Sequence, residues 1–124
     1  MIRKNSLPVL RAAEYERLAS FRYALRTFLH FSETVVARVG LTGQQYQALL
    51  VVRTLGETSP VSIVDLARQL LIKHNSAVGL ADRLVAQGLI ERERVAEDRR
   101  KVRLRLTSKG EKILGLLAAI HYQK

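Results

Sequence analysis

The sequence has no cysteine, and proline, glycine and acidic residues are scarce. Its 124 residues include two prolines and seven glycines. Without cysteine, disulfide bonds, thiolate catalysis, cysteine-ligated zinc and thiol-based redox sensing are excluded. Eleven Asp and Glu stand against 21 Lys and Arg, which leaves a formal net charge of +10. A surface of that sign attracts phosphates or acidic lipids before any specific contact forms, so the composition favours a polyanionic partner.

Long hydrophobic runs are also missing. No stretch approaches the roughly 20 apolar residues that a membrane-spanning helix needs, and the basic N-terminal residues lack the apolar segment that follows them in a signal peptide. At 48% hydrophobic and 26% charged residues, the composition is that of a globular chain whose length suits one domain over residues 1–124. We expect a cytoplasmic protein that does not bind membranes.

The residue constellations of catalysis and metal binding are absent from the sequence as well. His30, His74 and His121 have no metal-type spacing, and no glycine-rich phosphate loop occurs. Glu91 and Glu93 fall on one face of a short exposed strand rather than in a cleft. We therefore expect no enzyme activity, no cofactor and no bound metal.

Apolar residues at helical spacing predict two terminal helices, over residues 10–39 and 108–122. They carry more apolar surface than one small core needs, so a partner is expected to cover it. A symmetric homodimer formed by these helices is the commonest solution. The apolar positions are Leu18, Phe21, Leu25 and Phe28 in the first helix and Ile113, Leu114, Leu116, Leu117 and Ile120 in the last.

The middle of the chain predicts a helix-turn-helix over residues 62–87. A capping box marks one helix start, at Thr42 with Gln45. Ser62 is predicted to cap the next helix, with Asp65 near its positive end. Asn75 is predicted to cap the second helix of the motif, which ends before Gly88. Residues 89–106 then alternate with a two-residue period, which predicts a β-hairpin with a polar loop at residues 95–101.

A helix-turn-helix followed at once by a basic hairpin is typical of a winged helix. We therefore expect an α+β, mainly helical fold, a winged helix-turn-helix with long N-terminal and C-terminal dimerisation helices. Four stretches carry a family resemblance: Leu41-Thr42-x-x-Gln45, Asp65-Leu66-Ala67, Ala81-Asp82-Arg83-Leu84-x-x-x-Gly88-Leu89-Ile90, and Asp98-x-Arg100 followed by Leu106-Thr107-x-x-Gly110. With them the sequence resembles the MarR (multiple-antibiotic-resistance regulator) family of bacterial transcription regulators. Family members generally continue into a further helix that completes the dimer interface, so the end at Lys124 leads us to expect a smaller interface.

The predicted hairpin carries the densest charge, because residues 91–105 hold seven of the 21 basic residues. Arginine suits the narrow, electronegative minor groove, so the cations at the hairpin tip are predicted to reach DNA. Asp98 is expected to orient Arg100 through a charge-assisted pair. The alternative is a solvated charged hairpin, and for Arg103 and Arg105 both interpretations stay open. The predicted DNA-binding residues of the hairpin are Arg94, Asp98, Arg99, Arg100 and Lys101.

The start of a recognition helix enters the major groove and meets base edges. The candidate base readers are therefore Lys73, His74, Asn75, Ser76 and Gly79, with Gly79 allowing close approach of the backbone. Asn75 has a competing role as a helix cap, and Ser76 has one as a simple first-turn residue. Arg83 is expected to contact phosphate or to pair with a nearby acid.

The resemblance also implies an effector, because MarR-like regulators often bind small aromatic acids between the dimer helices and the winged helix. Arg22, Arg26 and His30 fall on one stripe of the first helix and could hold a carboxylate, although a solvated helix face explains the same stripe. We predict a homodimeric, sequence-specific regulator of double-stranded DNA, a ligand-responsive repressor that acts by occluding an operator. The alternative is a winged-helix module for protein–protein contact, and a membrane-surface protein fits less well.

Overall fold

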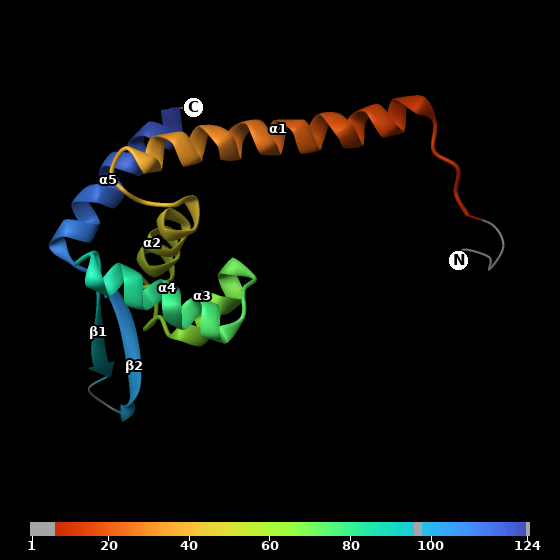
Figure 1. The fold of residues 1–124 in the computed structure, drawn as a ribbon. Coiled ribbons are helices and arrows are strands. Elements are labelled where there is room, and N and C mark those ends of the chain that lie inside the picture. The colour runs from red at the N-terminus through yellow and green to blue at the C-terminus, as the bar shows by residue number, and fades with distance from the viewer. Residues whose placement is uncertain (1–6, 96–97, 124) are drawn as a thin grey trace.

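The computed structural model describes residues 7–95 and 98–123, without the side chains of residues 98–100. Its elements follow the predicted order, and the mainly helical α+β fold with a two-stranded antiparallel sheet is confirmed (Figure 1). They are α1 (Ala12–Ala37), α2 (Gly43–Leu55), α3 (Ile63–Leu70), α4 (His74–Ala86), β1 (Ile90–Val95), β2 (Asp98–Leu106) and α5 (Ser108–Gln123).

The capping box predicted at Thr42 forms, and the predicted cap Ser62 makes a second capping box with Asp65. The Gln45 N–H donates to the Thr42 hydroxyl at 3.1 Å, and the Thr42 N–H donates back to the Gln45 side chain at 3.0 Å. Ser62 and Asp65 make the same reciprocal pair, at 3.1 and 3.0 Å. Each box satisfies two backbone donors that a helix start leaves without an internal partner, and so fixes where α2 and α3 begin.

The hydrophobic core lies where α2, α3, α4, the hairpin and part of α5 meet. Its largest fully buried side chains are Leu49, Leu66, Leu80, Leu84, Leu89, Ile90 and Leu117. Val61, just before α3, forms an isolated bridge to Leu104, whose N–H donates to the Val61 carbonyl at 2.7 Å. This bridge fixes the hairpin to the helix-turn-helix.

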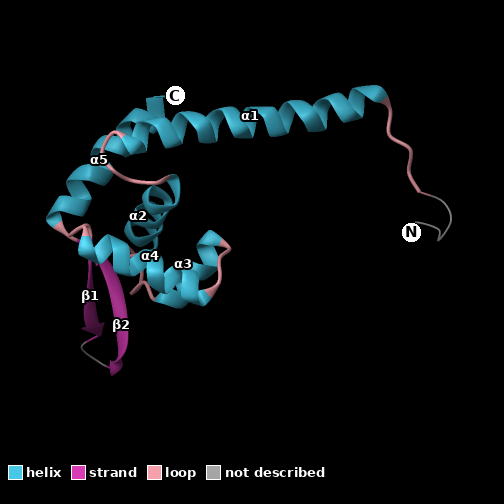
Figure 2. Cartoon of the chain, in the orientation of Figure 1, coloured by secondary structure: helices cyan, strands magenta, loops and turns pink. Residues whose placement is uncertain are grey.

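Most of α1 lies outside this core. The helix is two residues shorter at each end than predicted, and it extends away from the body of the molecule (Figure 2). Only Ser32, Val35 and Val36, near its C-terminal end, are buried. Gly40 follows with φ +78°, a left-handed conformation that favours glycine and turns the chain toward α2. Among the described residues, no helix is long and apolar enough to cross a bilayer.

The second strand of the hairpin is longer than the sequence indicated, because it includes residues 98–101, and the predicted loop at residues 95–101 is wrong. β2 begins at Asp98, Val95 pairs with Asp98, and the register is irregular between Arg94 and Val95. A polar stretch of this kind can form a strand without apolar alternation in its sequence, because an exposed two-stranded ribbon places charged side chains on its solvent face.

Candidate nucleic-acid interface

The turn of the helix-turn-helix is made by residues 71–73. Leu71 ends α3 in the left-handed region, at φ 57° and ψ 43°, and its N–H donates to the Arg68 carbonyl at 3.3 Å. The Ile72 N–H donates to the Ala67 carbonyl at 3.0 Å. Glycine is the usual residue at such a position, so the turn holds its leucine under backbone strain, with the side chain 91% exposed.

The N-cap of the recognition helix lies two residues earlier than predicted. α4 starts at His74, with Lys73 in the extended N-cap position, so the prediction of Asn75 as the cap is wrong. The Ala77 N–H donates to the Lys73 carbonyl at 3.0 Å, which sets the first turn. The burial of Ala77 and Leu80 fixes the rotation of the helix on the core. The preference of asparagine for a cap position is weak compared with this burial.

This helix start is open to a ligand in a way that the starts of α2 and α3 are not. No side chain caps α4, and its first turn contains no acidic residue. The uncapped N–H groups and the helix dipole therefore present a positive end. Four of the predicted base readers lie there with exposed side chains, namely Lys73, His74, Asn75 and Ser76.

Gly79 and Arg83 lie further along α4, four residues apart. Gly79 is half-buried and Arg83 is exposed. A Cβ added to Gly79 would lie 3.6 Å from the Arg83 guanidinium, an ordinary van der Waals contact. The fold itself therefore has room for alanine at position 79, and a need for glycine there would have to come from a partner.

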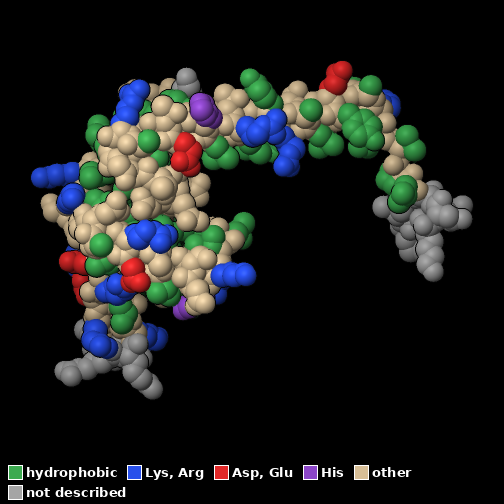
Figure 3. Space-filling model, in the orientation of Figure 1, with side chains coloured by type: hydrophobic (Ala, Val, Ile, Leu, Met, Phe, Trp, Pro, Cys, Tyr) green, Lys and Arg blue, Asp and Glu red, His purple; other side chains and the backbone are tan. Residues whose placement is uncertain are grey.

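The hairpin projects from the end of the body that lies away from α1, next to α4 (Figure 1). Arg94 and Lys101 are exposed near its far end. The side chains of Asp98, Arg99 and Arg100 lie outside the described residues, and so does the predicted Asp98–Arg100 pair. Figure 3 shows basic side chains over the hairpin and the neighbouring helices, whereas hydrophobic side chains follow α1.

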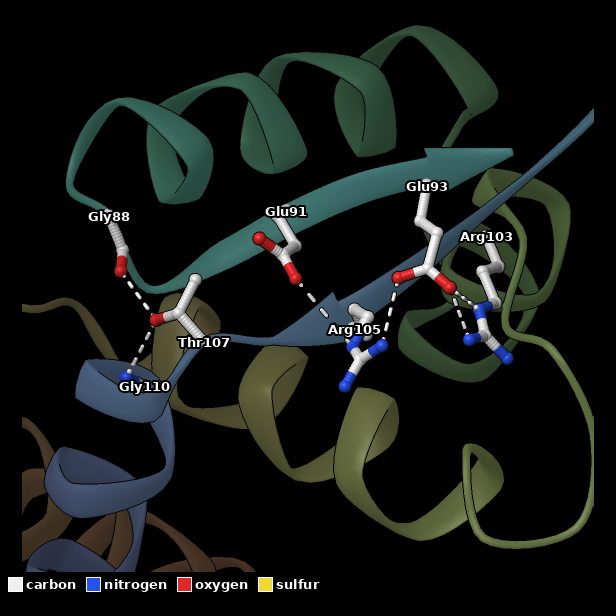
Figure 4. Close-up of polar contacts among 7 residues, drawn as sticks. All are labelled: Gly88, Glu91, Glu93, Arg103, Arg105, Thr107 and Gly110. Carbon is white, nitrogen blue, oxygen red and sulfur yellow. Dashed lines mark hydrogen bonds and ion pairs between the residues drawn. The ribbon is translucent and has the colours of Figure 1, made fainter. Parts of the chain in front are cut away.

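Arg103 and Arg105 of β2 face carboxylates across the hairpin. Glu93 lies opposite Arg103, and Glu91 lies opposite Arg105. The Arg103 Nε donates to Glu93 Oε1 at 2.9 Å, and the Arg105 Nη1 donates to Glu93 Oε2 at 2.9 Å (Figure 4). The hydrogen bonds from Arg105 and Arg103 lower the pKa of Glu93, while the bond to Glu93 raises the pKa of Arg105. Arg103 and Arg105 are thus both paired with carboxylates of the same chain. The alternation of apolar and basic residues in the sequence left open whether these two arginines contact DNA or belong to a solvated hairpin.

A further ion pair joins the base of the hairpin to the recognition helix. Arg92 of β1 donates to the Asp82 carboxylate of α4. The Leu106-Thr107-x-x-Gly110 stretch makes a second junction, because the Thr107 hydroxyl donates to the Gly88 carbonyl at 2.6 Å and accepts from the Gly110 N–H at 3.0 Å (Figure 4). Thr107 caps α5 as predicted, and it also holds α5 against the chain that connects α4 to β1.

The predicted ligand residues are spread along the exposed part of α1. Arg22, Arg26 and His30 all have exposed side chains. His30 borders a hollow on α1 that is also lined by Tyr23 and Phe31, and the two arginines are not among its lining residues. The structure therefore places only His30 of the three at a cavity.

Sequence reasoning missed an aromatic cluster around His121. Its ring stacks on Tyr46, with centroids 4.4 Å apart, and meets Phe28 and Phe31 edge-on. Its Nε2 lies 2.8 Å from the hydroxyl of buried Ser32, and its Nδ1 lies 2.7 Å from the Leu117 carbonyl. Burial raises the pKa of the Tyr46 hydroxyl. The cluster joins α1, α2 and α5 and borders a cavity of about 290 Å³. No local spacing signals it, because Ser32 and His121 are 89 residues apart.

Known proteins resemble the chain both in sequence and in fold. The sequence profile of the MarR family matches residues 39–101. The HTH-type transcriptional regulator FarR of Neisseria gonorrhoeae is 35% identical over 79 residues, which are 64% of this chain and 52% of that regulator. The chain thus spans about half the length of this curated relative.

Solved structures give the same fold at lower sequence identity. AbsC, a MarR family transcriptional regulator from Streptomyces coelicolor, has a TM-score of 0.78 at 22% identity, covering 94% of this chain and 78% of its own. MepR, a transcription regulator of the Staphylococcus aureus multidrug efflux pump MepA, has a TM-score of 0.75 at 19% identity, covering 83% and 74%. A MepR mutant bound to an oligodeoxyribonucleotide has a TM-score of 0.73 at 21% identity, covering 88% and 77%.

Proposed function

The chain belongs to the MarR family, and we propose that it is a sequence-specific transcription regulator that binds double-stranded DNA. The observation that carries this proposal is the uncapped, acid-free start of α4, where exposed polar and basic side chains stand next to a basic hairpin. A helix start of this kind binds phosphate through its N–H groups and reads base edges with its first side chains.

Two surfaces divide the work of recognition. The first turn of α4, with Lys73, His74, Asn75 and Ser76, enters the major groove and reads bases. Gly79 allows the backbone of α4 to come close to DNA, and Arg83 contacts phosphate. The hairpin reaches the backbone or the minor groove through its basic end, formed by Arg94, Arg99, Arg100 and Lys101.

The functional unit is a homodimer. Along α1, the side chains of Leu18, Phe21 and Phe28 are 55%, 64% and 48% exposed in one chain, and Leu116 of α5 is 56% exposed. A second copy of the chain would cover this apolar surface. Two-fold symmetry then places two recognition helices about one turn of DNA apart, which suits a palindromic operator.

A small aromatic or anionic effector regulates the binding. The cavity beside Tyr46 and His121 lies between α1, α5 and the helix-turn-helix. An occupant would therefore change the position of the recognition helix relative to the dimer helices. His30 lines the neighbouring hollow on α1, with Arg22 and Arg26 as further candidates for holding a carboxylate. In the absence of effector the protein occludes its operator and acts as a repressor.

Binding to duplex DNA at several salt concentrations tests the proposal. Contacts to about 6–10 phosphates across a dimer predict a slope of log affinity against log salt of roughly −5 to −9. Selection from a random duplex pool should then enrich one palindromic sequence. A winged helix that serves protein–protein contact would give a slope near zero and no enrichment, and that result would overturn the proposal.

A further inference from the structure

The basic residues of the hairpin fall into two groups. Residues 91–105 contain seven Lys and Arg, and at least three of them end in ion pairs with acids of the same chain. Arg92 pairs with Asp82 of α4, while Arg103 and Arg105 pair with the carboxylates of β1. The remaining four lie between Arg94 and Lys101, toward the far end of the hairpin.

Glu93 is the centre of the cross-strand pairs. One of its carboxylate oxygens accepts from Arg103 and the other accepts from Arg105 at 2.9 Å. Glu91 contributes less, because its carboxylate lies 3.7 Å from the Arg105 Nε, a distance outside hydrogen-bond range. Figure 4 shows the three charged groups of Glu93, Arg103 and Arg105 gathered on one face of the hairpin.

These pairs add little to the stability of the fold. The side chains are between 33% and 54% exposed, and ion pairs at such exposed sites contribute little to stability because water and salt screen them. Their effect on the electric field of the hairpin is larger. Both arginines lie within 3 Å of the Glu93 carboxylate, whose single negative charge offsets about half of their combined attraction for a phosphate several ångströms away.

We propose that Glu93 is a specificity-determining residue, which limits sequence-independent DNA binding by offsetting part of the positive charge of Arg103 and Arg105. The inference rests on the proposed DNA-binding function. Phosphate attraction to a cationic hairpin is the same for every sequence, so offsetting part of the charge of these two arginines reduces the affinity for random DNA. Base contacts made by α4 are unaffected, and the ratio of specific to non-specific affinity rises.

The test is the variant Glu93→Gln, which keeps the size of the side chain and removes its charge. Its affinity for a random-sequence duplex is measured by fluorescence anisotropy between about 50 and 200 mM salt. We expect the slope of log affinity against log salt to become steeper by about 0.9 for each arginine freed, and the affinity at low salt to rise about tenfold. Circular dichroism confirms that the variant is folded.

Matched variants separate this effect from a simple change in net charge. Glu57→Gln removes the same charge from an exposed pair with Arg53, outside the hairpin, and should change the slope little. Glu91→Gln should have an intermediate effect, because Arg105 keeps its bond to Glu93. Adding Arg103→Gln and Arg105→Gln to the Glu93 variant should restore the original slope.

The outcomes distinguish this inference from the function on which it rests. If the unaltered chain binds duplex DNA with a steep slope and Glu93→Gln leaves that slope unchanged, or changes it no more than Glu57→Gln does, the role of Glu93 is wrong while the function stands. If the unaltered chain binds no duplex at low salt, the proposed function fails, and the inference falls with it.

Discussion

Replacing Gly110 by alanine tests how α5 is joined to the winged helix. A Cβ added at this position would lie 2.0 Å from the carbonyl oxygen of Leu89. That oxygen belongs to backbone and also accepts from the Thr107 N–H at 3.1 Å, so it cannot move without breaking the junction. The first turn of α5 must therefore shift away from the chain between α4 and β1.

The magnitude follows from two opposing terms. In an unconstrained helix, Gly→Ala would stabilise the protein by about 0.5–1 kcal/mol. Here overpacking costs about 1–3 kcal/mol, and weakening the hydrogen bond between Thr107 and Leu89 costs about 1 kcal/mol more. We expect a net loss of about 2 kcal/mol in the free energy of unfolding, which for a chain of this length lowers Tm by roughly 6–10 °C.

Urea unfolding followed by far-UV circular dichroism measures the change, at one fixed protein concentration because any self-association shifts the midpoint. Two control variants have alanine where the structure offers room. An added Cβ meets nothing within 4 Å at Gly115 and only the tip of Arg83 at Gly79. Both controls should be as stable as the original chain or slightly more so. If Gly110→Ala behaves as they do, the close approach to Leu89 is wrong.

Three further predictions concern DNA binding and assembly. Changing Arg99 and Arg100 together to alanine should weaken binding to all duplexes about equally and flatten the slope of log affinity against log salt. Anisotropy titrations at several salt concentrations measure both effects. A loss of affinity confined to one sequence would contradict this prediction. Ser76→Ala should change the preference between operators by about 1–3 kcal/mol, since it removes a base contact; competition binding that shows equal losses on selected and random duplexes would disprove this role. Phe21→Arg should leave the unfolding of the single chain unchanged, because the side chain is 64% exposed, yet sedimentation should show a monomer where the unaltered chain is a dimer; an unchanged sedimentation coefficient would exclude this face from the interface.

Local signals in the sequence were sufficient for most of the fold. A capping box joins residues three positions apart, so Thr42 with Gln45 could be identified without knowledge of the rest of the chain, and so could Ser62 as a helix cap. The alternation of apolar and basic residues around Leu104 likewise predicted a half-buried strand, and Leu104 is buried. Such patterns depend on the neighbours of a residue along the chain, and these are given by the sequence.

Contacts between distant residues could not be predicted in the same way. Pairing Glu93 with Arg103 requires the register of the hairpin, which the alternation within each strand does not set by itself. The His121 cluster requires α1 and α5 to cross beside α2, and no sequence spacing encodes that crossing. In both cases the residue types were visible, but the partner of each side chain was set by tertiary packing.

The places where the chain departs from local rules coincide with the surfaces proposed to bind a partner. α2 and α3 start with capping boxes, whereas the N-cap residue of α4, Lys73, makes no side-chain cap. Leu71 occupies a left-handed position that favours glycine. A natural sequence keeps such unfavourable features where another requirement outweighs their cost. A capping side chain at the start of α4 would occupy the N–H groups that a phosphate needs, so the missing cap costs stability in the free protein and leaves this helix start available to DNA.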